Sequence, residues 1–245
     1  MIQATAGTQP VPSAGVLGKV RDFVRRHPAW WVVPAAAAAW ALMAVAPHPH
    51  AGHHGHAPAR GPDALATVAM IVAMMLPLAV PSIRHVAVSA TRRYRAMACF
   101  LAGYLAVWML AMLAITAAWT FAASLAGWTA AAVGAVTVAA LWEVLPARQR
   151  HARRCERTVP ITPAGWRAHA DCARYGATSG LACAGTCWAL MALCVAFAHG
   201  LPVMAVLFGV QLSGRYRGLS PSLAALAVLA VGAAAVAVRL TAGHA

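Results

Sequence analysis

Charged residues are scarce in this chain, and acidic residues are almost absent. Only 10% of the 245 residues are charged, 5 of them are Asp or Glu, and 62% are hydrophobic. Such a chain has too little polar surface for a water-soluble globule, so the composition indicates an integral membrane protein. The long Ala- and Leu-rich runs lack the alternation of barrel strands, which favours transmembrane helices.

The sequence also lacks the motifs of several enzyme classes. It has no nucleotide-binding loop, nucleophile elbow or zincin helix, which argues against an ATP-driven pump or a hydrolase. No histidine lies in the middle of an apolar run, where it could serve as an axial haem ligand. We therefore assign no catalytic residues and favour a function other than catalysis.

The formal net charge of +14 comes from 19 Lys and Arg residues. These residues lie in short segments between apolar runs, so they indicate lipid head groups rather than nucleic acid as the partner. If the N-terminus is cytoplasmic, only Arg60 and Arg239 fall on the outer side. This bias predicts a multi-pass membrane protein with a cytoplasmic N-terminus.

The order of the apolar runs predicts an all-α bundle of about seven transmembrane spans. A polar segment, residues 1–28, precedes a helical domain, residues 29–245, with a His-rich outer loop at 47–62 and a basic cytoplasmic loop at 147–179. Pro77 and Pro81 are expected to kink the second span, and Gly127 to form a turn between the third and fourth. The spans are expected at 30–46, 64–83, 96–125, 129–145, 180–198, 203–212 and 219–240, of which 203–212 is short enough to be re-entrant or tilted.

Sulfur is concentrated in the expected helix 180–198. Cys183 and Cys187 are four residues apart on one helix face, with Met191 four residues further on and Cys194 seven beyond Cys187. Thiolates and thioethers are soft ligands that select Cu(I), zinc or iron–sulfur clusters, so this stripe suggests a metal site. Ordinary packing is the alternative, because cysteine and methionine also fill apolar helix interfaces.

The basic loop supplies further candidate ligands. If the segment after Pro146 is helical, His151 and Cys155 project together. Facing the two thiols of helix 180–198, they would complete a set of three sulfurs and one nitrogen suited to Cu(I) or zinc. His169 and Cys172 form a reserve pair, and neighbouring arginines are expected to lower the thiol pKa values. Alternatively, these residues have no shared role in a lipid-facing loop.

Two further groups of residues could bind metal ions, one in the outer loop and one in the second span. The outer loop could collect Cu(II), Zn(II) or Ni(II) through its imidazoles, or it could be a simple flexible connection. Its five histidines are His48, His50, His53, His54 and His56. Met70, Met74 and Met75 in the second span could pass Cu(I) between this loop and the inner thiols, or could merely pack.

Glu143 is the one acidic residue well inside an expected span. A carboxylate within a membrane is costly and is usually paired or functional. We expect Glu143 to reach the interface and to pair with Arg148.

Several of these segments together resemble a known family. They are Met74-Met-Leu-Pro77, Phe100-Leu-Ala-Gly-Tyr104 with Trp108, Cys155, and Cys183-Ala-Gly-Thr-Cys-Trp-Ala-Leu-Met191. The combination resembles the bacterial family of predicted metal-binding integral membrane proteins, over roughly residues 64–240. The resemblance implies membrane residence and metal binding, but it implies no reaction.

The chain departs from the pattern of that family at three places. A cysteine commonly stands at the positions of His151 and Thr186, so the histidine retains a ligand and the threonine does not. Family members also tend to carry a Glu-Lys pair near the end of the penultimate span, whereas residues 211–215 here hold no acid.

We therefore predict a protein of the bacterial inner membrane that handles a soft metal ion, Cu(I) before Zn(II), by binding, delivery or transport. Its partners would be the lipid bilayer and a membrane or periplasmic metalloprotein. One alternative is a structural or assembly subunit of a membrane complex. Another is a thiol oxidoreductase using Cys183 and Cys187, which is disfavoured because four-residue spacing on a helix holds two sulfurs too far apart for an unstrained disulfide.

Overall fold

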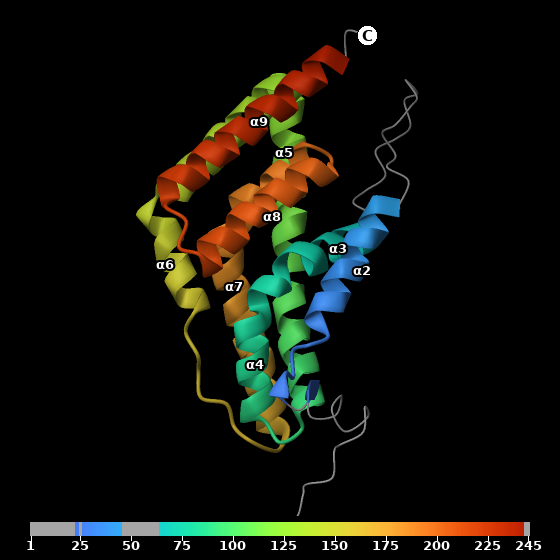
Figure 1. Ribbon diagram of the computed structural model, residues 1–245, viewed down its shortest axis with the longest axis vertical. Helices are drawn as coiled ribbons and strands as arrows, with labels where there is room; N and C mark the ends of the chain where they lie inside the picture. Colours follow the sequence, from blue (N-terminus) through green and yellow to red (C-terminus); the bar gives the residue numbers. More distant parts are fainter. Residues whose placement is uncertain (1–22, 25, 46–63, 243–245) are drawn as a thin grey trace, which may run out of the picture.

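The computed structural model describes residues 23–24, 26–45 and 64–242. The histidines of the predicted outer loop and most of segment 1–28 lie outside this part. Every regular element within it is helical, which confirms the all-α fold class. In chain order (Figure 1) these are α2 (Val32–Val45), α3 (Ala64–Met75), the 3₁₀ helix η1 (Pro77–Ala79), α4 (Val80–Ser89), α5 (Arg93–Val144), α6 (Pro146–Cys155), α7 (Trp166–Ala196), α8 (Leu201–Tyr216) and α9 (Pro221–Ala242).

Helix α5 consists of two helical arms joined at Gly127. This residue has φ 76° and ψ 160°, a conformation that glycine adopts without a Cβ penalty and that does not belong to a helix. In Figure 1 the chain rises along the first arm, turns at the top of the molecule and descends alongside α9. The predicted turn at Gly127 is therefore confirmed.

Two prolines break the helix that was expected at residues 64–83. α3 ends at Met75, η1 begins at Pro77, and Pro81 lies in the first turn of α4. Proline lacks a backbone N–H and clashes with the preceding turn, so it bends or ends a helix. The parts before and after the break are bent by 45°, which confirms the predicted kink.

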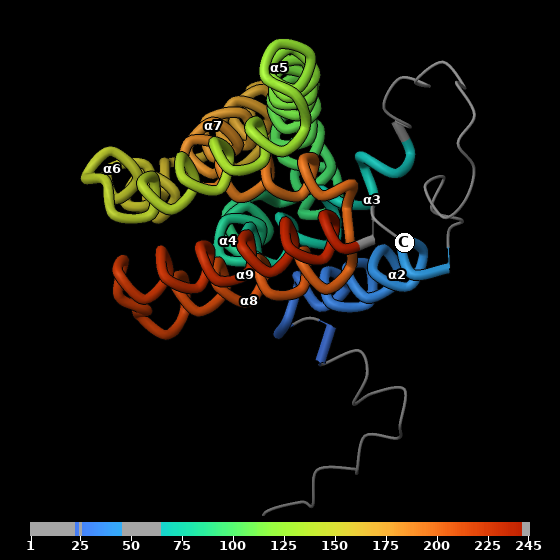
Figure 2. The backbone as a smooth tube through the Cα atoms, turned by 90° about the horizontal axis from the view of Figure 1, so that it is seen from above, coloured from blue at the N-terminus to red at the C-terminus, as the bar shows by residue number. Residues whose placement is uncertain are grey.

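Helices α5 and α7 share the most extensive helix interface. Their backbones approach closely because a Cβ at Gly176 would overlap the backbone of Phe100, and one at Gly103 would overlap that of Ala173. This interface buries the Tyr104 side chain, which is 1% exposed. Seen from above in Figure 2, α4 lies between this helix pair and α8.

Helix α7 begins at Trp166, well before the expected start at Gly180. Residues 166–179 are rich in polar side chains, so the pattern of apolar residues does not predict this part of the helix. One face of this stretch is nevertheless buried, including Cys172 and Tyr175, and that burial stabilises the helix. Residues 147–179 thus hold α6 and the first half of α7 instead of one long loop.

Within the described residues, three helices are long and apolar enough to cross a membrane: α5, α7 and the 221–241 part of α9. The bent α3–α4 pair would make a fourth if it counts as one span. α2 and α8 are shorter, with 14 and 16 residues. About seven spans and a cytoplasmic N-terminus stay predictions.

Candidate functional site

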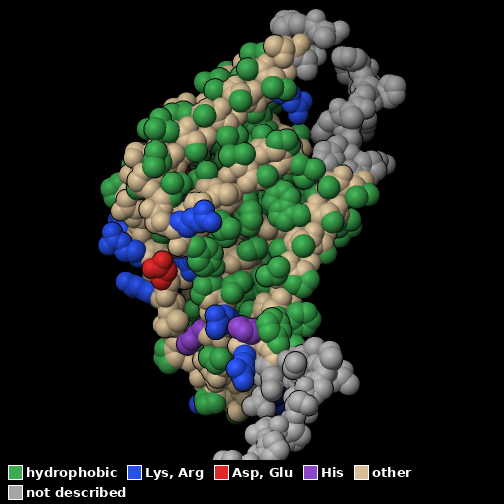
Figure 3. All heavy atoms as spheres, in the orientation of Figure 1, with side chains coloured by type: hydrophobic (Ala, Val, Ile, Leu, Met, Phe, Trp, Pro, Cys, Tyr) green, Lys and Arg blue, Asp and Glu red, His purple; other side chains and the backbone are tan. Residues whose placement is uncertain are grey.

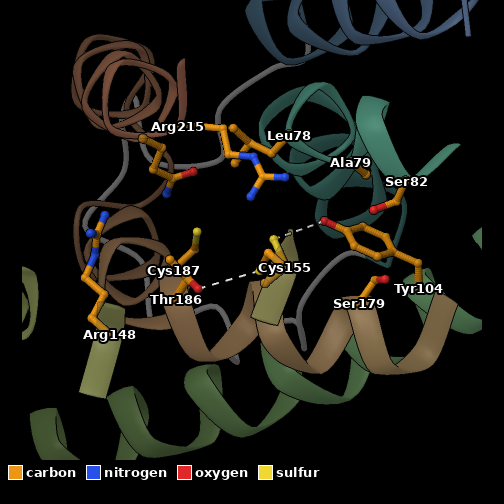
Figure 4. A pocket seen from close by; sticks show the side chains of 12 residues that line it. Leu78, Ala79, Ser82, Tyr104, Arg148, Cys155, Ser179, Thr186, Cys187 and Arg215 are labelled. Atoms are coloured by element: carbon orange, nitrogen blue, oxygen red, sulfur yellow. Dashed lines mark hydrogen bonds between the residues drawn. The ribbon is translucent and has the colours of Figure 1, made fainter. Parts of the chain in front are cut away.

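A pocket of about 50 Å³ lies where η1 and helices α4 to α8 meet. Arg215 extends into it from α8, opposite Cys155 and the α7 side chains Thr186 and Cys187 (Figure 4). Its walls are Leu78, Ala79, Ser82, Tyr104, Arg148, Cys155, Ser179, Cys183, Thr186, Cys187, Gln211 and Arg215. Three thiols from two helices therefore open into one cavity.

Helix α6 brings Cys155 to the sulfur stripe of α7. The segment after Pro146 is helical, which meets the condition for His151 and Cys155 to project together, and Cys155 is its last residue. Cys155 lines the same pocket as Cys183, and its thiol lies 3.8 Å from the hydroxyl oxygen of Thr186. Thr186 donates its own proton to the carbonyl of Ala182 over 2.8 Å, so its oxygen is free to accept from the thiol.

The pKa of Cys155 is raised above its ordinary value. The hydrogen-bond contact with Cys183 is the largest cause, burial adds to it, and the positive charge of Arg215 acts in the opposite direction. Arg215 thus lowers this pKa, as expected of a neighbouring arginine, but Cys183 and burial outweigh it. Cys155 is protonated at neutral pH, so a metal ion that binds its sulfur must displace that proton.

Tyr104 contacts the thiol site from α5. Its hydroxyl lies 3.2 Å from the Sγ of Cys183 and 3.3 Å from the carbonyl oxygen of Met75. A phenol has one proton, so it can donate to the carbonyl while the thiol is protonated, or to the sulfur once this is a thiolate. Tyr104 was not among the predicted site residues, although it belongs to the segment Phe100–Tyr104 that contributed to the family resemblance.

His151 lies at the α6–α7 interface and does not line the pocket. Its imidazole lies directly over Gly185, where an added Cβ would overlap the ring. Gly185 is the glycine of the Cys-x-Gly-x-Cys segment, so its physical role is to let α6 approach α7. The structure thus brings Cys155 to the thiols and holds its predicted partner His151 one turn away along α6.

The other predicted ligands lie elsewhere. Met191 is fully buried further along α7. Cys172 is also fully buried, but it precedes Cys183 by three helical turns, roughly 16 Å along the axis. His169 lines a separate pocket near the N-terminus of α7. The five histidines of the outer loop lie outside the described residues.

Polar and cationic groups surround the three thiols. Arg148 pairs with Glu143 at 3.0 Å, as predicted, and that carboxylate is fully buried. Arg215 lies 4.0 Å from Glu156 at the rim. Gln211 is buried, and neither its amide nitrogen nor its oxygen has a hydrogen-bond partner. Such surroundings favour a ligand or complex with negative charge.

In the part of the chain that the structure describes, no three His, Cys, Asp or Glu side chains are placed to hold one metal ion as they stand. Structural zinc sites have four ligands, whereas the pocket lining offers three thiols. Cu(I) is soft and accepts two sulfur ligands, and Cys155 and Cys183 both line the pocket. The donor set therefore favours Cu(I).

A family model named PpoB2 and described as a copper chaperone matches residues 65–238. The chain belongs to this family. The match contains every residue that lines the pocket, and it excludes residues 47–62. The curated proteins and the solved structures searched contain no match to the chain. Family membership indicates copper handling, which agrees with the metal that the sequence predicted.

Proposed function

We propose that this chain is an integral membrane copper chaperone that binds Cu(I) in the pocket between α6 and α7 and passes it to a partner metalloprotein. The convergence of the Cys155, Cys183 and Cys187 thiols on one pocket carries this proposal. Membership of a copper chaperone family supports the choice of metal.

Cu(I) would replace the protons of Cys155 and Cys183. Cys187 opens into the same cavity and would complete a three-sulfur set after a small side-chain rotation. Two or three thiolates around one Cu(I) carry net negative charge, which is costly to bury without compensation. Arg148 is already paired with the buried Glu143, so the compensating charge would come from Arg215, whose contact with the exposed Glu156 is 4.0 Å long.

The difference in exposure between the thiols favours transfer through α6. Cys155 is partly exposed, whereas Cys183 and Cys187 are buried, at 7% and 5%. A partner thiol or thioether would reach copper from the Cys155 side, and Cys155 would be the first ligand exchanged. This order gives delivery a direction, from the buried α7 sulfurs outward through the end of α6.

Two observations support residence in a bacterial inner membrane with several spans. In the most apolar stretch of α5 only 22% of the residues are buried, and in that of α9 only 17%, whereas 61% are buried in that of α7. Large apolar side chains such as Leu110 and Phe121 are exposed, as lipid-facing residues are.

In Figure 3, Lys and Arg side chains gather beside α6 and at the lower end of the molecule, whereas the upper part is largely hydrophobic. This distribution supports a cytoplasmic N-terminus.

Anaerobic titration of detergent-purified protein with Cu(I) against a chromogenic chelator tests the proposal. The variant Cys155→Ser/Cys183→Ser is expected to lose one equivalent of tightly bound copper. Cys99→Ser is the matched control, because Cys99 lies outside the pocket and should leave binding unchanged. Equal copper binding by the wild type and the double variant would refute the proposal.

A further inference from the structure

A second pair of sulfur atoms lies in the interior, away from the pocket. The Sγ of Cys194 on α7 is 4.0 Å from the Sδ of Met74 on α3. Both side chains are fully buried, and neither lines the pocket. Two helices distant in sequence thus place a thiol and a thioether against each other.

The geometry of this pair suits a soft ion. Two metal–sulfur bonds of about 2.3 Å each, arranged in a line, would hold two sulfurs roughly 4.6 Å apart. The observed separation of 4.0 Å therefore needs only a small outward shift of either side chain. Methionine has three rotatable bonds, so Met74 can make that shift without moving the backbone.

The charge of the resulting complex also suits a dry interior. Cu(I) would replace the proton of Cys194, and the Met74 thioether is neutral, so the S–Cu–S unit carries no net charge. Burying a neutral unit avoids the large desolvation penalty of an isolated ion. This distinguishes the pair from the pocket thiols, whose anionic complex has arginines beside it.

The pair lies on the same stripe of α7 as the pocket thiols. Cys194 follows Cys187 by two turns, about 10 Å along the helix, and fully buried Met191 lies between them in sequence. On the facing side, the Met75 carbonyl next to Met74 is within hydrogen-bonding distance of the Tyr104 hydroxyl that contacts Cys183. Sulfur-bearing side chains thus follow one another along α7 from the pocket into the interior.

We propose that Met74 and Cys194 form a second Cu(I) site, which can be filled independently of the pocket. This proposal rests on the proposed function only for the choice of copper as the ion. It predicts a chain that binds two equivalents of Cu(I) in two chemically different environments.

The test combines copper stoichiometry with copper K-edge X-ray absorption on full-length protein labelled with selenomethionine. Wild-type protein loaded with two equivalents is expected to show a copper–selenium contact from Met74. Met74→Leu/Cys194→Ser should bind one equivalent and lose this contact. The matched control Met97→Leu/Cys99→Ser changes the same residue types on α5 and should keep both.

The labelled wild type requires no mutation, so it tests the proposal even if a variant fails to fold. Absence of a copper–selenium contact at two equivalents would overturn it. The pocket variant Cys155→Ser/Cys183→Ser separates the two claims. If that variant keeps one equivalent with the selenium contact, the interior site stands on its own. If it keeps two, the proposed function fails while the interior site stands, and if it binds none, the independent interior site is refuted.

Discussion

The hydroxyl of Tyr104 on α5 lies 3.2 Å from the sulfur of Cys183 on α7, although 79 positions separate the two residues in the chain. The same oxygen lies 3.3 Å from the carbonyl of Met75, beside the break between α3 and η1. When Cys183 becomes a thiolate, the Tyr104 hydroxyl can turn its hydrogen bond from the Met75 carbonyl to the sulfur and keep its proton. The Tyr104 hydroxyl thus lies between the Cys183 thiol of α7 and the end of α3.

Tyr104→Phe is expected to weaken Cu(I) binding. It removes a hydrogen bond to a charged sulfur, which contributes about 1.5–3 kcal/mol, so affinity should fall roughly tenfold or more. Chelator competition measures the change. Tyr175→Phe is the matched control, because its hydroxyl donates to the Arg157 carbonyl and contacts no thiol. Equal effects of the two substitutions would contradict a specific role for Tyr104.

Gly185→Ala is expected to push α6 away from α7, since the new Cβ would overlap the His151 ring. Overpacking of this kind costs about 1–3 kcal/mol, and it would also separate Cys155 from Cys183. We expect weaker Cu(I) binding by chelator competition. Gly134→Ala provides the control, because Gly134 lies in the second arm of α5 and a Cβ there meets open space. Unchanged affinity in Gly185→Ala would show that the α6–α7 distance does not matter.

His151→Ala should restore copper binding when it is combined with Gly185→Ala. Removing the imidazole makes room for the new methyl group, so α6 can return to its place. His151→Ala alone should bind copper nearly as well as the wild type, because His151 does not line the pocket. A large loss of affinity in this single variant would instead identify His151 as a ligand.

Arg148→Met is expected to destabilise the fold, because it leaves the fully buried Glu143 carboxylate unpaired. Removing one partner of a buried ion pair typically costs about 3–5 kcal/mol. Thermal unfolding in detergent should show a lower Tm, which the double variant Glu143→Leu/Arg148→Met should largely recover. Arg150→Met serves as the control, since Arg150 is exposed on the same helix. A double variant no more stable than Arg148→Met would argue against the pair.

Cu(I) affinity should rise with pH. The pKa of Cys155 lies above its ordinary value because of Cys183 and burial, so the thiol is protonated at neutral pH and copper must displace its proton. Each proton displaced changes the apparent Kd about tenfold per pH unit, and acid weakens binding. Chelator competition between pH of about 6 and 8 should show a slope that falls by one proton in Cys155→Ser. A slope that Cys155→Ser leaves unchanged would exclude Cys155 as a ligand.

Local patterns predicted much of the fold. Helical character, the break at Pro77 and the turn at Gly127 follow from residues adjacent in the chain. The start of α7 at Trp166 could not be read in this way, because polar residues 166–179 form a helix only through burial against α5. Tertiary packing supplied what the local sequence did not.

The candidate site was predictable where its ligands share one helix. Cys183 and Cys187 lie on one stripe by spacing alone, and His151 and Cys155 lie one turn apart for the same reason. Which of that second pair meets the α7 thiols depends on how α6 crosses α7, and helical spacing does not contain this information. The same holds for Tyr104 and Arg215, which reach the pocket from other helices.

The most direct test of the pocket site is the copper K-edge X-ray absorption spectrum of the Met74→Leu/Cys194→Ser variant loaded with one equivalent of Cu(I). In this variant the pocket thiols are intact. We predict a first shell of two or three sulfur atoms at about 2.3 Å. A shell dominated by nitrogen or oxygen, or a sulfur shell that persists after Cys155→Ser/Cys183→Ser is added, would contradict binding by these thiols.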